Sequence, residues 1–127
     1  MLHRPIFVIG SSRSGTSMLA SLIGSSPELC FFTEHPVVRH HMWAMVEKPS
    51  IIHNELPQLE KTLVRLSGIS TGQRLLEKTP GHSLLADSLA AYFSDAKFIH
   101  IVRDGRDVAS SMLKHSLIGP ELLEVNK

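Results

Sequence analysis

Residues 6–17 read IFVIGSSRSGTS, and this stretch decides the fold. Its first four residues are apolar and mostly β-branched or aromatic, as in a strand that is buried on both faces of a parallel sheet. Residues 10–15 are rich in glycine and serine and predict a loop, and residues 16–23 carry apolar side chains at helical spacing. A strand, a glycine-rich loop and a helix in this order direct backbone N–H groups and the positive end of a helix dipole at an anion.

The loop has the two glycines of the Walker A pattern, separated by four residues, but not its lysine. Thr16 stands where a nucleoside-triphosphatase carries the lysine that contacts the β and γ phosphates. A cation is present as Arg13, inside the loop, where a guanidinium can bind an anionic group through paired hydrogen bonds. The pattern therefore favours anion binding over a plain connecting turn, and it argues against hydrolysis of ATP or GTP.

Strand and helix patterns alternate along the rest of the chain, which indicates βαβ units and a parallel sheet. The expected fold class is therefore α/β, with a P-loop-type parallel sheet flanked by helices in three layers. The further strands are expected at residues 29–32, 75–76 and 97–102 and the further helices at residues 37–47, 54–67, 82–92 and 107–117, with Asp107 as the N-cap of the last helix.

Length and composition describe one ordinary globular domain over residues 1–127, with 43% hydrophobic and 20% charged residues. The formal net charge of +1 gives no sign of a nucleic-acid partner. Cys30 is the single cysteine, so the fold does not depend on an internal disulfide. No apolar run approaches the length of a membrane span and no signal peptide precedes the first strand, so the expected localisation is cytoplasmic.

A second motif occurs near the end of the chain, where residues 97–107 read KFIHIVRDGRD. Arg103 comes just past the expected end of a strand, and ligands of open α/β sheets bind outside the carboxyl ends of strands. Ser111 follows eight residues later, in the next helix, so an arginine and a hydroxyl could hold a phosphate together. Surface ion pairs among Arg103 and its charged neighbours are the alternative, and these residues alone leave both open.

Together, the two motifs resemble those of the sulfotransferases that use 3′-phosphoadenosine-5′-phosphosulfate (PAPS) as sulfuryl donor. Arg13, Ser14, Gly15, Thr16 and Ser17 are similar to that family's 5′-phosphosulfate loop, and the resemblance implies that they bind the donor. Arg103 and Ser111 are similar to its 3′-phosphate motif. The resemblance covers about residues 5–115, whereas family members are usually about twice as long, so the domain is expected to be truncated at its C-terminus.

Residues 77–80, EKTP, are similar to the branch that contains tyrosylprotein sulfotransferases and many bacterial enzymes. The cytosolic small-molecule enzymes carry a catalytic histidine shortly after a Lys-Thr pair, and here a proline follows instead. The branch implies that Glu34 is the general base and that Lys78 and Arg13 lie near the transferring group. His82, just after this segment, is the alternative base.

The implied reaction moves a sulfuryl group from PAPS to a hydroxyl or amine of a small-molecule, glycan or peptide acceptor, and the scheme requires no metal. A P-loop kinase or phosphotransferase is one alternative. The other is a catalytically incomplete fragment that binds PAPS or its product, adenosine 3′,5′-bisphosphate (PAP), and transfers nothing.

Two other groups of side chains have structural interpretations. His35, His40 and His41 are expected to be surface residues, because no recognised ligand spacing joins them into a metal site. Trp43 is expected to pack its helix with Met42 and Met45, and not to line a substrate pocket.

Overall fold

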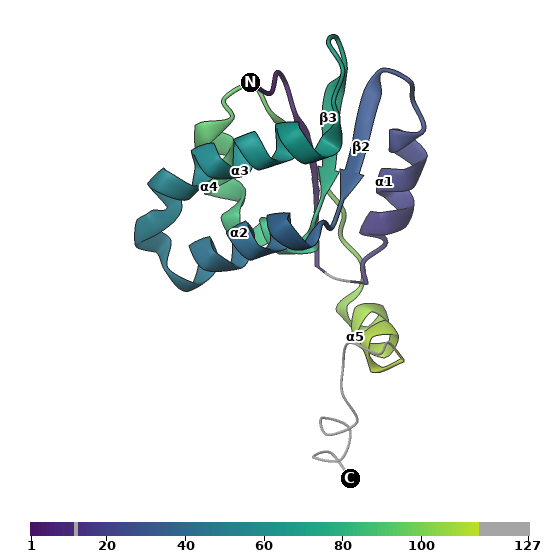
Figure 1. Cartoon of the computed structure of the whole chain (residues 1–127). Coiled ribbons are helices and arrows are strands. Elements are labelled where there is room, and N and C mark those ends of the chain that lie inside the picture. The colour runs from purple at the N-terminus through teal and green to yellow at the C-terminus, as the bar shows by residue number, and fades with distance from the viewer. Residues whose placement is uncertain (12, 115–127) are drawn as a thin grey trace.

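A computed structural model describes residues 1–11 and 13–114, in which helices cover both faces of a parallel sheet (Figure 1). The strands are β1 (Ile6–Ile9), β2 (Leu29–Thr33), β3 (Arg74–Lys78) and β4 (Lys97–His100). The α-helices are α1 (Thr16–Gly24), α2 (Pro36–Glu47), α3 (Ile52–Ser67), α4 (Ala86–Tyr92) and α5 (Gly105–Leu113), and the short 3-10 helices are η1 (Pro49–Ile51) and η2 (Pro80–Leu85).

The four strands lie in the order β2-β3-β1-β4, and all neighbouring pairs are parallel. The connection after β1 runs to β2 at one edge of the sheet, whereas the connection after β3 passes β1 and runs to β4 at the other edge. The two connections therefore diverge from the crevice between β1 and β3, which is where open α/β sheets bind ligands. Every connection that follows a strand begins at this same carboxyl edge. The predicted α/β class with a parallel sheet is confirmed.

The strand side chains divide between two cores because alternate residues of a strand point to opposite faces. On one face α1 covers a small cluster formed by Ile6, Val8, Ala20 and Leu76. On the other face α2, α3 and α4 cover a larger core, and Figure 1 shows these helices on the opposite side of the sheet from α1. The larger core includes Phe7, Met45, Leu59, Leu63, Leu75 and Leu89. The expectation of three layers is therefore confirmed.

Two strands differ from their predicted lengths. β3 extends to Lys78, which is buried beside Glu34, a residue distant in sequence and therefore invisible to a local pattern. β4 ends at His100 and not at residue 102, because its neighbour β1 ends at Ile9 and leaves no strand to pair with. Val102 is correspondingly exposed.

Two helices also begin differently from the prediction. The segment 82–92 starts as the 3-10 helix η2, in which the N–H of His82 bonds to the carbonyl of Thr79, and becomes α-helical only at Ala86. The prediction of Asp107 as an N-cap is wrong, since Asp104 caps α5 with a side-chain bond to the N–H of Arg106. Residues 115–117 of the predicted helix lie outside the described part of the chain.

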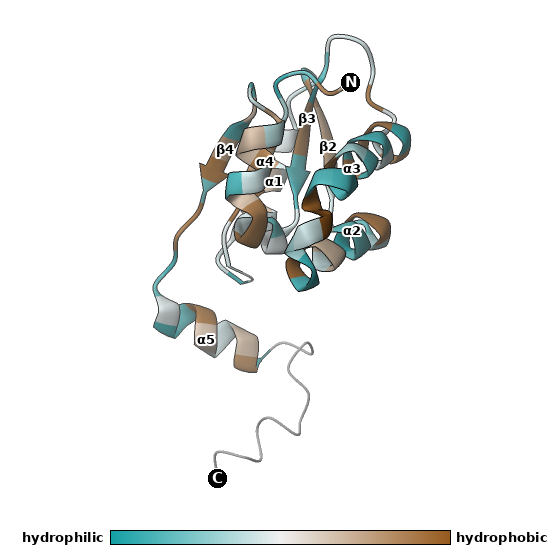
Figure 2. Ribbon diagram, turned by 90° about the vertical axis from the view of Figure 1, so that its left-hand side faces the viewer, coloured by the Kyte–Doolittle hydropathy of each residue, from teal (hydrophilic) through white to brown (hydrophobic). Residues whose placement is uncertain are grey.

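Helix α5 lies beyond the carboxyl edge of the sheet, apart from the layers that α1 to α4 form (Figure 2). The connecting segment 101–104 leads away from β4, which places Ser111 of α5 opposite the loop that follows β1. None of the helices within the described residues is both long and apolar enough to cross a membrane.

Candidate active site

The loop between β1 and α1 is shaped by two glycines. Gly10 has a φ of +155°, and a Cβ there would meet the carbonyl oxygen of Ile101 at 2.7 Å. Gly15 has a φ of +96° and is the N-cap of α1. Other residues would be strained in these conformations, and at Gly10 they would also push away Ile101, the residue after β4. The glycines therefore hold the loop close to the sheet and place the start of α1 at its carboxyl edge.

Inside the loop, the hydroxyl of Ser14 donates to the carbonyl of Ser11, and both Ser14 and Thr16 are buried. Gly15 has no side chain with which to cap α1, so the first N–H groups of this helix have no side-chain acceptor from its N-cap. Ser17 is exposed on the first turn. The loop residues thus surround a helix end that offers hydrogen-bond donors to an anion.

The loop is fixed from the opposite side by η2. The hydroxyl of Ser83 donates to the carbonyl of Gly10 at 3.0 Å and accepts from the N–H of Gly10 at 2.9 Å. No local sequence pattern indicates this contact, because the two residues are 73 positions apart. The residue after β1 is therefore tied to the segment that follows β3.

Glu34 and Lys78 meet at the ends of β2 and β3. The carboxylate Oε1 of Glu34 lies 3.2 Å from Nζ of Lys78, and Lys78 is almost fully buried while Glu34 is 44% exposed. The N–H of Glu34 and the hydroxyl of Thr33 both donate to the carbonyl of Lys78. The structure therefore brings together two of the three residues that were predicted to be catalytic.

Two residues of the site adopt left-handed backbone conformations, which are uncommon for residues other than glycine. Arg13 has a φ of +64° and Glu34 a φ of +47°. Such conformations cost about 1–3 kcal/mol and persist only where surrounding contacts hold them. For Glu34 the contact is its backbone bond to Lys78. Strain of this kind concentrates at functional sites.

Arg13 connects the two predicted phosphate motifs. Its Nε donates to the hydroxyl of Ser111 at 3.0 Å, and its carbonyl accepts from a guanidinium N–H of Arg103 at 3.0 Å. The residues predicted to bind a 3′-phosphate thus lie against the loop that was predicted to bind a 5′-phosphosulfate. The order of the strands explains this proximity, because β4 is the direct neighbour of β1.

The alternative of surface ion pairs holds for only part of the second motif. Asp104 forms an exposed ion pair with Arg106 at 2.8 Å, and the pKa of Asp104 is lowered by its side-chain and backbone hydrogen bonds from Arg106. Arg103 instead turns toward the loop. Asp104 therefore serves to start α5, the helix that carries Ser111.

His82 is buried and cannot be reached from the carboxyl edge. It has no exposed surface, and its Nδ1 lies 2.7 Å from Oε2 of Glu77, which is also fully buried. The other oxygen of Glu77 accepts from the hydroxyl of Thr79. This geometry favours Glu34 over His82 as a general base, because Glu34 is exposed and lines a cavity.

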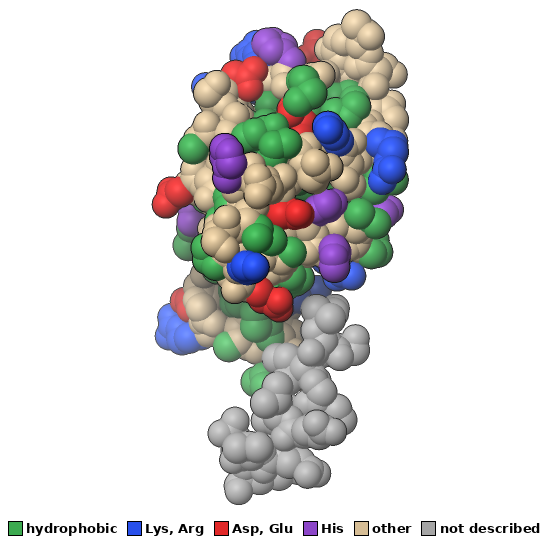
Figure 3. All heavy atoms as spheres, turned by 60° about the vertical axis from the view of Figure 1, so that its left-hand side comes forward, with side chains coloured by type: hydrophobic (Ala, Val, Ile, Leu, Met, Phe, Trp, Pro, Cys, Tyr) green, Lys and Arg blue, Asp and Glu red, His purple; other side chains and the backbone are tan. Residues whose placement is uncertain are grey.

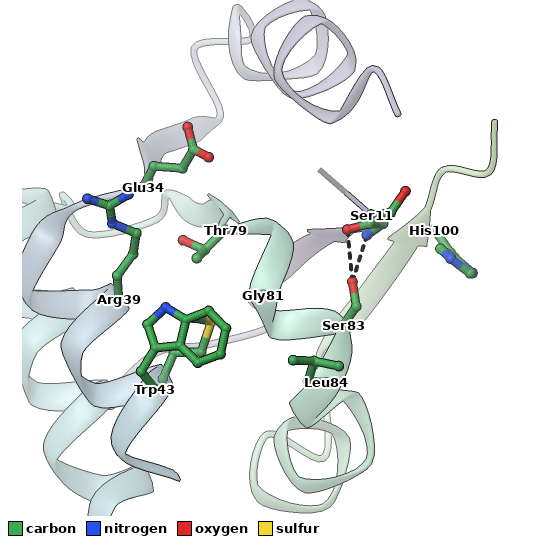
Figure 4. A pocket seen from close by; sticks show the side chains of 11 residues that line it. Ser11, Glu34, Arg39, Trp43, Thr79, Gly81, Ser83, Leu84 and His100 are labelled. Atoms are coloured by element: carbon green, nitrogen blue, oxygen red, sulfur yellow. Dashed lines mark hydrogen bonds between the residues drawn. The ribbon is translucent and has the colours of Figure 1, made fainter. Parts of the chain in front are cut away.

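The cavity has a volume of about 460 Å³ and lies beside Glu34 (Figure 4). Its walls come from the start of the loop, from α2 and from the segment after β3. The lining residues are Gly10, Ser11, Glu34, Arg39, Met42, Trp43, Thr79, Gly81, Ser83, Leu84 and His100. A volume of this size suits a small molecule. Of the predicted site residues only Glu34 lines it.

Sequence reasoning missed the α2 wall of this cavity. Met42 and Met45 are buried as expected, but Trp43 is 50% exposed and lines the cavity, so the expectation that it only packs the helix is wrong. Arg39 and Trp43 are four residues apart on α2, and this spacing could have placed them on one face. The sequence could not show that this face of α2 lines the same cavity as η2.

The expected surface histidines are not all exposed. His41 is partly buried, and its Nδ1 lies 2.8 Å from Oε2 of Glu55 on α3, so it joins two helices. On the face of the molecule that Figure 3 shows, basic, acidic and histidine side chains are interspersed and do not gather into one basic patch.

A sequence model described as "Sulfotransferase family" matches residues 50–121, more than half of the chain. This chain belongs to the sulfotransferase family. The match spans Lys78, Arg103 and Ser111, and it begins after the glycine-rich loop and Glu34. The loop motif is therefore evidence that is independent of the family match.

Among solved structures, the chain is similar to the crystal structure of sulfotransferase STF1 from Mycobacterium tuberculosis, with 17% sequence identity and a TM-score of 0.47. The similarity covers 81% of this chain and 46% of the mycobacterial chain, so the chain spans less than half of that protein's length. No curated protein matches the chain significantly.

Proposed function

We propose that this chain binds PAPS at the carboxyl edge of its sheet and contributes the donor site of an enzyme that transfers a sulfuryl group to a hydroxyl or amine. The observation that carries the proposal is the position of Arg13, which touches both Arg103 and Ser111. A ligand with phosphate or sulfate groups at two separate positions, as PAPS has, fits two anion motifs that adjoin each other.

The chemistry of the donor set also fits PAPS. The loop and the first turn of α1 would hold the 5′-phosphate through N–H groups and the hydroxyls of Thr16 and Ser17. Arg103 and Ser111 would bind the 3′-phosphate, which separates PAPS from ordinary adenine nucleotides. Arg13 and Lys78 would stabilise the charge on the sulfuryl group and on the oxygen that it leaves.

Sulfuryl transfer places demands on the protein similar to those of phosphoryl transfer, namely positioning and charge stabilisation. A bond forms between the acceptor oxygen and sulfur while the bond from sulfur to the 5′-phosphate oxygen breaks, and the electron pair of that bond leaves with PAP. Glu34 takes the proton of the acceptor hydroxyl as general base. Lys78 keeps the Glu34 carboxylate at the end of β2 through their ion pair.

A kinase is the weaker candidate for two reasons. The loop has Thr16 in place of the Walker lysine. Asp104, the acidic residue that follows β4, is engaged in capping α5 and in pairing with Arg106. The second alternative, binding without transfer, differs from the enzyme only in turnover.

Turnover is therefore the test of the proposed function. The chain would be incubated with PAPS that carries radioactive sulfur and with a panel of phenols, alcohols and amines, and the products would be separated by chromatography. Labelled sulfate esters or sulfamates are the expected products. If the Glu34→Gln variant forms none of them, the transfer activity depends on the site that contains Glu34. Binding of PAP without any labelled product would support the binding-only alternative, and phosphorylation from labelled ATP would support the kinase.

A further inference from the structure

The cavity beside Glu34 has a composition that identifies a chemical class of acceptor, and this inference rests on the proposed function. One wall is formed by Arg39, Met42 and Trp43 of α2, and the facing wall carries Leu84 of η2 (Figure 4). None of these residues belongs to the loop or to the motif of Arg103 and Ser111. The donor loop borders this space only through its first residues, Gly10 and Ser11.

The apolar part of the cavity includes two large side chains that remain exposed. The indole of Trp43 is 50% exposed and the side chain of Leu84 is 66% exposed, while Met42 is buried beneath them. Large apolar side chains that stay exposed on the walls of a cavity are a common property of ligand sites. An aromatic ring gains both burial and a favourable stacked or edge-on arrangement against an indole.

The charged part of the cavity has an excess of positive charge. The carboxylate of Glu34 is already paired with Lys78. Within residues 1–11 and 13–114, no carboxylate lies within ion-pair distance of Arg39, and its guanidinium makes no hydrogen bond. Arg39 is an exposed side chain that extends from α2 toward the region of Glu34 (Figure 4). A guanidinium without a partner is suited to bind a carboxylate through two hydrogen bonds.

We propose that this cavity is the acceptor site and that it binds an aromatic hydroxyl compound, a phenol, that also carries a carboxylate. Trp43 and Leu84 hold the ring, Arg39 pairs with the carboxylate, and Glu34 receives the proton of the phenolic hydroxyl. The oxygen of that hydroxyl forms the new bond to sulfur, and the bond from sulfur to the donor's phosphate oxygen breaks.

Two probes of nearly equal shape test the role of charge, namely 4-hydroxyphenylacetate and its neutral amide, 4-hydroxyphenylacetamide. Trp43 is the only tryptophan of the chain, so its fluorescence reports on this cavity alone. Both probes would be titrated into the chain in the presence of PAP, with excitation at the red edge of tryptophan absorption. We expect the carboxylate probe to change the emission at about tenfold lower concentration than the amide, which corresponds to one charge-assisted contact.

The matched variants are Arg39→Gln and Arg65→Gln, because Arg65 is an exposed arginine of α3 that lies outside the cavity. Arg39→Gln is expected to abolish the preference for the carboxylate, and Arg65→Gln to keep it. Equal binding of the two probes to the unmodified chain, no response to either, or a preference that survives Arg39→Gln would each overturn the proposal.

Calorimetry with PAP on the same samples separates this inference from the proposed function. Unchanged PAP affinity in Arg39→Gln, together with a lost carboxylate preference, supports an acceptor role for Arg39. A fall in PAP affinity with an unchanged preference would assign Arg39 to the donor and overturn the acceptor site. Failure of the unmodified chain to bind PAP would count against the proposed function itself, whatever the probes do.

Discussion

Nε of Arg13 donates a hydrogen bond to the hydroxyl of Ser111 at 3.0 Å, although the two residues are 98 positions apart. One belongs to the loop after β1 and the other to the helix after β4. Their contact joins the two motifs into one arrangement at the carboxyl edge of the sheet. Within that arrangement, the two motifs are expected to bind different phosphate groups of one ligand.

Arg103→Ala is expected to weaken the binding of PAP by about tenfold or more, because a charge-assisted contact to the 3′-phosphate is lost. Adenosine 5′-phosphate lacks that phosphate, so its affinity is expected to change little. Calorimetric titration of both ligands checks this, with Arg65→Ala as the matched control on α3. Equal losses for the two ligands would remove the 3′-phosphate assignment and leave Arg103 with a structural role toward Arg13.

Glu34→Gln is expected to keep the affinity for PAP while it lowers the rate of sulfuryl transfer by about 100-fold or more, because a positioned general base is lost. The rate with labelled PAPS and the affinity for PAP are measured on the same preparation. Glu47→Gln, at the exposed end of α2, is the control for the substitution itself. Retained transfer would show that another group accepts the proton, and it would reopen the assignment of the base.

Ser83→Ala is expected to lower the free energy of unfolding by about 1–3 kcal/mol, because the buried N–H and carbonyl of Gly10 lose their common partner. PAP affinity is expected to fall as well, since Gly10 begins the loop. Urea denaturation measures the stability, with Ser88→Ala on α4 for comparison. A loss of stability no larger than that of Ser88→Ala would mean that η2 does not hold the loop.

Asp104→Ala is expected to speed hydrogen exchange of the α5 amides, because the helix loses its cap. Asp104→Asn keeps an acceptor oxygen at this position and is expected to have a smaller effect. The pKa of Asp104 is lowered in the folded chain, so its contribution is present above the ordinary carboxyl pKa and is lost as the pH falls through the lowered value. Exchange in the unmodified chain should therefore approach that of Asp104→Ala only in strong acid. Identical exchange in all three proteins at neutral pH would contradict the capping role.

The sequence predicted those parts of the fold that local patterns encode. β1, the loop and α1 follow one another within residues 6–24, so strand pattern, glycine spacing and helix pattern indicated them together. The burial of Lys78 could not be predicted, because its partner Glu34 becomes its neighbour only in the folded sheet. β3 was therefore predicted too short.

The proposed donor side of the candidate site could be predicted from the sequence, whereas the proposed acceptor side could not. The loop and the pair of Arg103 and Ser111 follow spacings that are visible in the sequence. Trp43 follows the same helical spacing as any packing residue, and only the position of η2 relative to α2 shows that its ring faces a cavity. Asp104 and Asp107 are both plausible caps by residue type, and the earlier end of β4 decided between them.

Calorimetric titration of the unmodified chain with PAP, beside ATP with magnesium, tests the central claim most directly. The arrangement of Arg13, Arg103 and Ser111 predicts that PAP binds more tightly than ATP, because PAP carries the 3′-phosphate that ATP lacks. Tighter binding of ATP, or equal binding of the two, would contradict the assignment of this site to PAPS.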